Sequence, residues 1–357
     1  MTYGLLALLA ALFLVEELRG GSTDTLVLLR MGANFPPLVF DGQWYRLVTA
    51  ALLHIGAVHL LMNGWALFQL GRLSEVTFGG ATTLALFVFT GIAGSALTLL
   101  STKVSAGASG AIFGLEGALV AFFLRHRDRL TPVGLNLLKQ LLVWSGVVLV
   151  YGFAVPGIDW LGHLGGFLAG LAAGWTIRPW RGGTPGLLAR AAASLAAALV
   201  VASLAALIAG ERFVTRVDPA QGIALEAPAS WRIEREAQAL VARDPLAALG
   251  TAAFVSAGFE PVGDPAAALD RALGVEDLPP GFELAQEPYE SGPWLRRTFV
   301  WRAEEVELAG FAQARCEADG CLVAFAAAAG SLYGSYFPTL ERIAGSLRRA
   351  DAGRSGE

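Results

Sequence analysis

Seven predominantly apolar stretches occupy most of the first 210 positions of the chain. They lie at residues 3–18, 50–70, 80–100, 106–124, 135–154, 159–177 and 187–209. A helix needs about 20 mainly apolar residues to cross a hydrocarbon core of about 30 Å, so each stretch predicts a membrane-spanning helix. The first stretch is the weakest, because its uncharged run ends at Glu16. A secretory signal peptide is the alternative for it, although the stretch has no basic start and no clear Ala-x-Ala cleavage site.

The pattern changes after Gly210. Apolar and polar residues alternate at 294–301 and 306–314, which predicts antiparallel strands with one buried face, and 333–347 has helical spacing. We therefore expect an all-α polytopic membrane protein joined to a soluble α/β domain of the α+β type with an antiparallel sheet. The expected parts are a six-helix membrane domain at 1–180, a seventh transmembrane helix at 181–210, the α/β domain at 211–350 and a disordered tail at 351–357.

Composition agrees with a membrane protein. Apolar residues make up 55% of the chain and charged residues 16%, against about 45–50% and about 25% in soluble proteins. These values exclude a disordered chain, a basic nucleic-acid-binding domain and a disulfide-rich mini-protein. Lys and Arg number 12 against 8 Asp and Glu through Gly210, and 14 against 22 from Glu211 onward. The apolar half is therefore slightly basic, and the second half is acidic.

The distribution of Lys and Arg predicts the orientation, because these residues stay preferentially in cytoplasmic loops. With the N-terminus in the cytoplasm, the inner loops contain Arg72, Arg125, Arg127, Arg129, Arg178, Arg181 and Arg190. The short outer turns contain only Lys103 and Asp159 as charged residues, whereas the longer outer connection at 19–47 contains three Arg. Seven crossings then place the C-terminal domain on the outer face. We expect an integral protein of a bacterial plasma membrane with this domain extracytoplasmic.

Both cysteines lie in the C-terminal domain. Cys316 and Cys321 flank an Asp-Gly turn signal. A disulfide across this turn suits an oxidising outer compartment, and a pair of free thiols is the alternative. A C-x-x-C redox motif or a zinc site needs closer spacing or more ligands.

Polar residues inside the apolar stretches are the candidates for chemistry, because they are costly in hydrocarbon. His59 and Asn63 are four residues apart on the second predicted helix and share one face. Two donors on one face can point at a single developing negative charge. The alternative is a pair of interhelical hydrogen bonds that holds the bundle together.

A serine and a histidine begin the fourth and sixth stretches. Small residues surround Ser109 and leave its hydroxyl open, and His163 follows an Asp-Trp-Leu-Gly segment. Gly166, Gly170 and Gly174 form G-x-x-x-G steps that allow helices to approach closely. Close packing of the two helices would bring Ser109 and His163 together at one depth, and a histidine-activated serine is the minimum apparatus for acyl transfer.

Together these features resemble the rhomboid family of intramembrane serine proteases over roughly residues 35–178. The residues that carry the resemblance are Trp44-Tyr-Arg46; His54, His59 and Asn63 as H-x4-H-x3-N; Gly71-Arg72 through Glu75 to Gly79; Gly107-Ala-Ser109-Gly110; and Gly162-His163-Leu-Gly-Gly166 with Gly170. Gly162 departs from the family, in which Ala often precedes the histidine.

The resemblance implies a role for each matched residue. Ser109 corresponds to the nucleophile and His163 to the general base and acid, with His59, Asn63 and the Ser109 backbone N–H as oxyanion donors. Among the supporting residues, Phe113 would pack against the His163 ring, and His54 would tie the first loop to the second helix. Trp44 and Arg46 would sit in the membrane interface, and Arg72 and Glu75 would fasten the inner ends of the second and third helices. The remaining supporting residues are the small residues Gly107, Gly110, Gly166 and Gly170.

The implied activity is cleavage of transmembrane segments of other membrane proteins near the outer face by the Ser-His dyad. No cofactor, metal or nucleic acid is expected; the partners are transmembrane substrates, the lipid bilayer and a protein partner of the C-terminal domain. One alternative is a catalytically inactive rhomboid-like protein that serves in membrane binding or quality control. A haem or zinc site at His54, His59 and His163 is the other, but no Cys or carboxylate joins them at ligand spacing.

Two features remain outside this assignment. Glu116 is an intramembrane carboxyl group on the same face as Ser109, for which the sequence indicates no role. Residues 222–233 and the final helix resemble PsbP/Mog1-type α/β/α sandwiches. Without histidine or further cysteines this domain offers no Ser/His or metal cluster, so we interpret it as a binding or regulatory module, with an Asp/Glu or lone-thiol site as the alternative.

Overall fold

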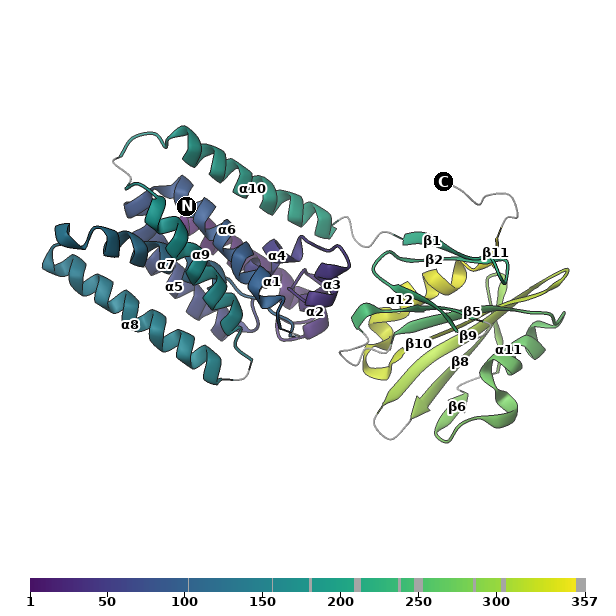
Figure 1. The fold of residues 1–357 in the computed structure, drawn as a ribbon. Helices are drawn as coiled ribbons and strands as arrows, with labels where there is room; N and C mark the ends of the chain where they lie inside the picture. The colour runs from purple at the N-terminus through teal and green to yellow at the C-terminus, as the bar shows by residue number, and fades with distance from the viewer. Residues whose placement is uncertain are drawn as a thin grey trace. The chain divides into compact units, whose positions relative to one another are not determined.

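The computed structural model describes residues 1–101, 103–155, 157–179, 182–208, 213–236, 239–246, 253–284, 287–302 and 306–350. The chain forms two compact units, Met1–Gly210 and Glu211–Glu357. The first unit is helical and the second is built on antiparallel strands, as Figure 1 shows. The predicted disordered tail at 351–357 lies outside the described residues.

Each predicted apolar stretch overlaps one long helix. These helices are α1 (Thr2–Leu18), α5 (Ala57–Phe78), α6 (Gly80–Thr98), α7 (Ser109–Arg125), α8 (Pro132–Ala154), α9 (Trp160–Thr176) and α10 (Leu187–Ile208). The second stretch is displaced most, because α5 begins seven residues later than 50 and continues to Phe78. Its start follows Gly56, whose φ of +81° breaks the chain direction. Residues 46–52 and α5 consequently meet at an angle of 93°.

The apolar helices fit a membrane domain. Among the residues that the structure describes, α6, α8 and α10 are long and apolar enough to cross a membrane, and the bent pair at 46–52 and 57–78 would be a fourth span. Helices α1, α7 and α9 have 17 residues each, or about 26 Å at 1.5 Å per residue. Valines and aromatic residues of α8 are exposed along much of its length, as expected for a lipid-facing helix. The count of six helices plus one stays a prediction.

The connection at 19–47 contains short helices rather than an open loop. They are α2 (Thr25–Arg30), α3 (Pro36–Phe40) and α4 (Arg46–Thr49), followed by the 3-10 turn η1 (Ala50–Leu52). The Asp24 carboxylate caps α2 by accepting from two backbone N–H groups. A small apolar core holds the connection against the bundle. It combines Val27 of α2 with Leu53 and Ala106, which lie in the segments before α5 and α7.

Helix α7 forms the centre of the membrane unit, because 12 of its 17 residues are buried. Helix α9 lies directly against it. A Cβ atom on Gly166, Gly170 or Gly174 would lie 1.9, 2.0 or 2.2 Å from a carbonyl oxygen of α7. The two backbones are therefore in contact, and only glycine fits at these three positions.

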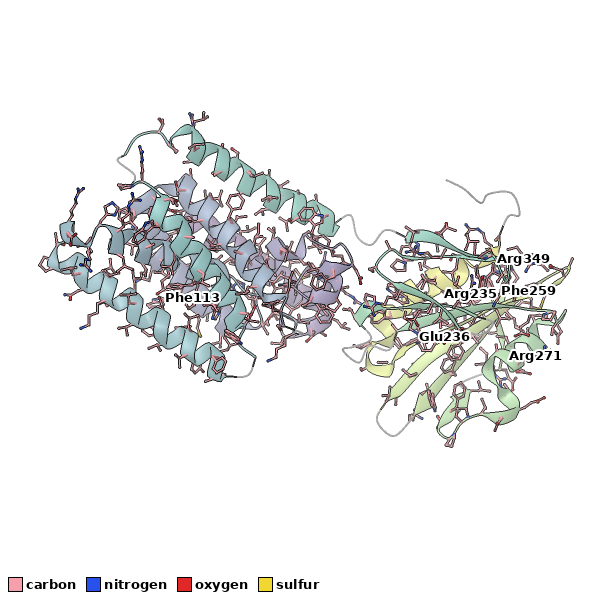
Figure 2. The ribbon with its side chains drawn as sticks, in the orientation of Figure 1. Phe113, Arg235, Glu236, Phe259, Arg271 and Arg349 are labelled. Carbon is pink, nitrogen blue, oxygen red and sulfur yellow. A yellow bond between two sulfur atoms is a disulfide. The ribbon has the colours of Figure 1, made fainter. Side chains whose placement is uncertain are left out.

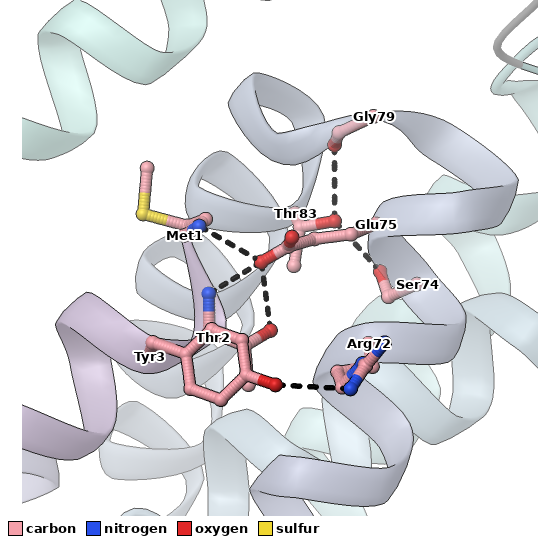
Figure 3. Close-up of polar contacts among 8 residues, drawn as sticks. All are labelled: Met1, Thr2, Tyr3, Arg72, Ser74, Glu75, Gly79 and Thr83. Carbon is pink, nitrogen blue, oxygen red and sulfur yellow. Dashed lines mark hydrogen bonds and ion pairs between the residues drawn. The ribbon is translucent and has the colours of Figure 1, made fainter.

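The polar contacts of Arg72 and Glu75 in the described residues are with α1, which corrects the expectation that they fasten α5 to α6 (Figure 3). The Arg72 guanidinium donates to the Tyr3 hydroxyl over 2.9 Å. The Glu75 carboxylate accepts from the Thr2 hydroxyl over 2.7 Å and from its backbone N–H, and it pairs with the Met1 amino group at 3.1 Å. Both side chains point toward the start of α1 because they lie on the α5 face that packs on it.

The corner between α5 and α6 is held by hydroxyl groups instead (Figure 3). Gly79, with φ of +84°, turns the chain. The Thr83 hydroxyl lies 3.0 Å from the Gly79 carbonyl oxygen and 3.1 Å from the Ser74 hydroxyl, and both side chains are fully buried. These contacts perform the fastening that was expected of Arg72 and Glu75.

The second unit contains two antiparallel sheets. The small sheet has the order β1 (Phe213–Asp218), β2 (Ile223–Pro228) and β11 (Arg348–Arg349). The large sheet has the order β3 (Arg232–Glu236), β4 (Ala239–Arg243), β5 (Phe254–Glu260), β10 (Gly320–Ala329), β9 (Glu307–Glu317), β8 (Trp294–Arg302) and β6 (Phe282–Leu284), with β7 (Tyr289–Ser291) also paired to β8. The strands predicted at 294–301 and 306–314 are confirmed as β8 and β9.

Two helices cover opposite faces of the large sheet. Leu269 of α11 (Pro265–Leu273) packs in a cluster with Ala312 and Ala314 of β9. Phe337 of α12 (Tyr333–Gly345) contacts Phe311, the residue next to Ala312, at 5.9 Å between ring centroids. Because successive strand residues point to opposite faces, the two helices enclose the sheet. The helix predicted at 333–347 is confirmed as α12.

Two further contacts stabilise the second unit. Cys316 and Cys321 face each other across the β9–β10 hairpin and form a disulfide. The Arg349 guanidinium of β11 lies 4.1 Å from the ring centroid of Phe259 in β5, which joins the small sheet to the large one (Figure 2). The disulfide thus closes a covalent loop around the hairpin turn predicted at Asp319-Gly320.

The glycine contact between α7 and α9 is testable by thermal unfolding in detergent. Gly170→Ala is expected to lower the midpoint, since its Cβ would lie 2.0 Å from the Gly114 carbonyl oxygen and overpacking costs about 1–3 kcal/mol. Gly146→Ala in α8 is the matched control, because no atom lies within 4 Å of its Cβ. Equal midpoints for the two variants would contradict the close contact.

Candidate active site

Ser109 and His163 lie within hydrogen-bond distance of each other. Ser109 is the first residue of α7, and His163 lies in the first turn of α9. The Ser109 Oγ is 2.8 Å from the His163 Nε2. The close packing of the two helices places both side chains at the same end of the pair, so a hydroxyl and a potential proton acceptor meet in a largely buried setting.

An aromatic ring supports the histidine. Phe113, labelled in Figure 2, lies one turn after Ser109 in α7. Its ring is stacked on the His163 imidazole, with 4.7 Å between centroids and 10° between planes. The His163 side chain, which is 7% exposed, is therefore held in position on one face and by Ser109 at its edge.

The second ring nitrogen of His163 has no carboxylate partner among the residues that the structure describes. Within the described part of the chain, the buried Nδ1 makes no hydrogen bond. These described residues therefore provide a pair of side chains without the carboxylate of a triad.

His59 lies against the backbone that leads to Ser109. A Cβ atom on Gly107 would be 2.6 Å from the His59 Cε1 and 2.9 Å from its Nε2, so only glycine allows this approach. Gly107 also has φ of +145°. Asn63, one turn further along α5, is buried and donates one amide N–H to the His59 carbonyl oxygen over 3.1 Å. Because an amide group has two such donors, one remains for another acceptor.

His54 supports His59 from the other side. The two imidazole rings meet edge to face, with 5.3 Å between centroids. The His54 backbone N–H donates to the Glu16 carboxylate of α1, 3.2 and 3.3 Å from its two oxygens. His54 therefore joins the segment before α5 to α1. The sequence did not predict this role for the buried Glu16 carboxylate, because there Glu16 marks only the end of an uncharged run.

Arg46 and Trp44 differ in their surroundings. Arg46 is 5% exposed, and its guanidinium donates to the carbonyl oxygens of Leu29 (2.7 Å), near the end of α2, and Ala33 (2.9 Å), just beyond it. Trp44 is 48% exposed. Arg46 therefore holds the first connection together from inside and does not lie at the surface, contrary to the expectation of an interface position. Trp44 does lie at the surface.

Asp159 is a further polar residue near the pair, and sequence reasoning treated it only as a loop charge. Its Oδ1 accepts from the Gly162 backbone N–H over 2.8 Å and caps α9. Its Oδ2 accepts from the hydroxyls of Thr98 (2.6 Å) and Ser105 (2.5 Å). An Asp directly before a helix is a known N-cap signal and could have identified it.

Two other expectations concern Glu116 and metal binding. Glu116 is buried on α7, seven residues beyond Ser109, and it takes no part in the Ser109–His163 contact. Across the described ranges, no three His, Cys, Asp or Glu side chains gather as they would around a metal ion.

Comparison with known proteins gives consistent results for the membrane unit. Residues 41–180 match the Rhomboid domain. The rhomboid protease GluP of Bacillus subtilis (strain 168) is 40% identical over 174 residues, covering 48% of this chain and 34% of that protein. RHOMBOID-like protein 5 of Arabidopsis thaliana is 35% identical over 168 residues, covering 45% and 52%. The putative rhomboid protease YdcA of Bacillus subtilis is 32% identical over 173 residues, covering 46% and 82%.

The extent of these matches differs. The chain spans about a third of GluP and about half of RHOMBOID-like protein 5, but most of YdcA. For the second unit, the solution structure of cyanobacterial PsbP from Synechocystis sp. PCC 6803 aligns over 38% of this chain and 92% of that chain, with 13% identity and a TM-score of 0.29. A score this low carries no argument about fold or function.

The stacking of Phe113 on His163 predicts an effect on the reactivity of Ser109. Phe113→Ala is expected to slow labelling of Ser109 by a fluorophosphonate about 2- to 10-fold, equivalent to the 0.5–1.5 kcal/mol that aromatic pairs contribute. The rate is measured per folded protein. Phe123→Ala removes another buried ring of α7, away from His163, and serves as the control. Equal labelling rates in both variants would contradict a role for the stack.

Proposed function

The chain belongs to the rhomboid family, and from this premise we propose that it is an intramembrane serine protease that cleaves membrane-spanning segments of other membrane proteins. The observation that carries the proposal is the 2.8 Å contact between Ser109 Oγ and His163 Nε2 inside the region that matches the Rhomboid domain. A serine in contact with a histidine is the arrangement that nucleophilic acyl transfer requires.

In the proposed reaction the Ser109 Oγ attacks the scissile carbonyl carbon while His163 Nε2 accepts its proton. The imidazolium then donates this proton to the nitrogen of the leaving amine, and the C–N bond breaks. An acyl-enzyme ester remains on Ser109. Water attacks the ester with His163 again as general base, which releases the new carboxylate and restores the hydroxyl.

The tetrahedral intermediates carry a negative oxygen that needs donors. We assign this role to the His59 imidazole, the free N–H of the Asn63 amide and the Ser109 backbone N–H. The approach of His59 to Gly107 supports the assignment, because it brings the imidazole next to the segment that leads into Ser109. Each donor of this kind typically contributes about 10²–10³ in rate.

The depth of the site follows from the orientation of the helices. Ser109 and His163 both lie at the N-terminal ends of their helices. With the Arg-rich loops in the cytoplasm, these ends face outward. We therefore propose cleavage near the outer face, with the N-terminus cytoplasmic and the second unit, 211–350, extracytoplasmic after a seventh span within 181–210. Transmembrane proteins of the same bilayer, here a bacterial plasma membrane, are the proposed substrates.

The proposal is tested by labelling detergent-solubilised protein with a fluorophosphonate and by cleavage of a model transmembrane substrate in liposomes. Ser109→Ala and His163→Ala are expected to abolish both signals, because each removes one half of the proton-transfer pair. Ser101→Ala and His126→Ala change the same residue types elsewhere in the membrane unit and should retain both signals. Folded wild-type protein that neither labels nor cleaves would favour a rhomboid-like protein without catalytic activity.

A further inference from the structure

The Asp159 carboxylate connects three separate segments at the outer end of the membrane unit. Its two oxygens accept from Gly162 in α9, from Thr98 at the end of α6 and from Ser105 in the segment before α7. All three distances, 2.8, 2.6 and 2.5 Å, are those of well-formed hydrogen bonds. A carboxylate has the acceptor capacity for three donors, which a neutral amide oxygen lacks.

The position of this carboxylate in the sequence relates it to the proposed active site. Asp159 precedes His163 by four residues, and Ser105 precedes Ser109 by four residues. The Asp159–Ser105 hydrogen bond therefore joins the two segments immediately before the two residues of the dyad. It fixes the distance between the segment that leads into α7 and the segment that leads into α9, at the end of the helix pair where the glycine contacts begin.

The first connection is joined to the same point. Asn34 and Ser105 form an isolated antiparallel bridge, in which each backbone N–H donates to the carbonyl oxygen of the other over 2.8 Å. The Asn34 side chain also donates to the Ser95 carbonyl oxygen of α6 over 2.8 Å. Ser105 is thus held from one side by the first connection and from the other by Asp159.

We propose that Asp159 is a positioning residue that sets the geometry of the Ser109–His163 pair by joining the start of α9 to Ser105 and Thr98. This inference rests on the proposed function and adds a residue to it. Asp159 does not act as a third member of a triad, because the described residues offer no hydrogen bond to His163 Nδ1.

The charge of Asp159 gives it a second effect on the reaction. His163 lies in the first turn of α9, where the positive end of the helix dipole opposes the formation of an imidazolium. The Asp159 carboxylate caps that end of the helix. Its negative charge offsets the dipole while His163 carries the proton of Ser109.

The test compares Asp159→Ala and Asp159→Asn with wild type. Asparagine is also a good N-cap residue and its amide can donate to the two hydroxyls, so it keeps the three segments joined without the charge. Asp128→Ala, which changes an exposed carboxylate of an inner loop, is the matched control. Hydrogen exchange in detergent reports on the segments 103–109 and 157–164, and kcat and KM are measured with a model transmembrane substrate in liposomes.

Asp159→Ala is expected to speed exchange in both segments about fivefold, as for loss of a helix cap. It should lower kcat about 100-fold, the effect of a misplaced catalytic pair, while KM changes less than about twofold. Asp159→Asn should restore wild-type exchange and recover most of kcat, with the remaining deficit due to the lost charge. Asp128→Ala should match wild type in all measurements.

Two results would overturn the inference. Unchanged exchange in Asp159→Ala would show that the carboxylate does not hold the segments, whether or not the protein is a protease. Faster exchange with an unchanged kcat would show a role in stability alone. Wild-type protein without cleavage would instead refute the proposed function, and the exchange measurement would still decide whether Asp159 holds the dyad segments together.

Discussion

The contact between the backbones of α7 and α9 is the constraint on which the membrane unit depends. Gly166, Gly170 and Gly174 each face a carbonyl oxygen of α7 at a distance that no larger residue tolerates. Such a contact fixes the position of one helix along the axis of the other, because sliding along that axis would press a carbonyl oxygen against a neighbouring side chain. Ser109 and His163 meet because they lie at the ends of two helices whose axial positions relative to each other are fixed by this contact.

Several charged side chains inside the unit are paired with polar groups of other segments. Arg46 donates to the end of α2, Glu16 accepts from the His54 N–H, and Asp159 accepts from α9 and two hydroxyls. An unpaired polar group in an apolar medium lowers the free energy of unfolding by roughly several kcal/mol. Each pairing therefore strongly favours a single arrangement of the chain. The short helices of the first connection are held by these contacts as much as by their small apolar core.

The second unit depends on different interactions. Its large sheet is enclosed by α11 and α12, which bury alternate residues of β9 on its two faces. The ion pairs on its surface, such as Arg243 with Glu234 and Glu236, are exposed to water, where an ion pair contributes about 0–1 kcal/mol. Burial of the alternating apolar positions, together with the Cys316–Cys321 disulfide, therefore accounts for this fold.

The sequence by itself determined the two units, the location of the long helices, the strands β8 and β9 and the candidate pair Ser109 and His163, because apolar length, alternation and small-residue spacing are local properties. It did not determine the start of α5, the short helices α2 to α4 or the partners of Arg72 and Glu75. The roles of Glu16 and Asp159 also appeared only in the tertiary structure. Each of these depends on which backbone groups a side chain meets after the helices pack, and a one-dimensional pattern contains no record of such long-range contacts.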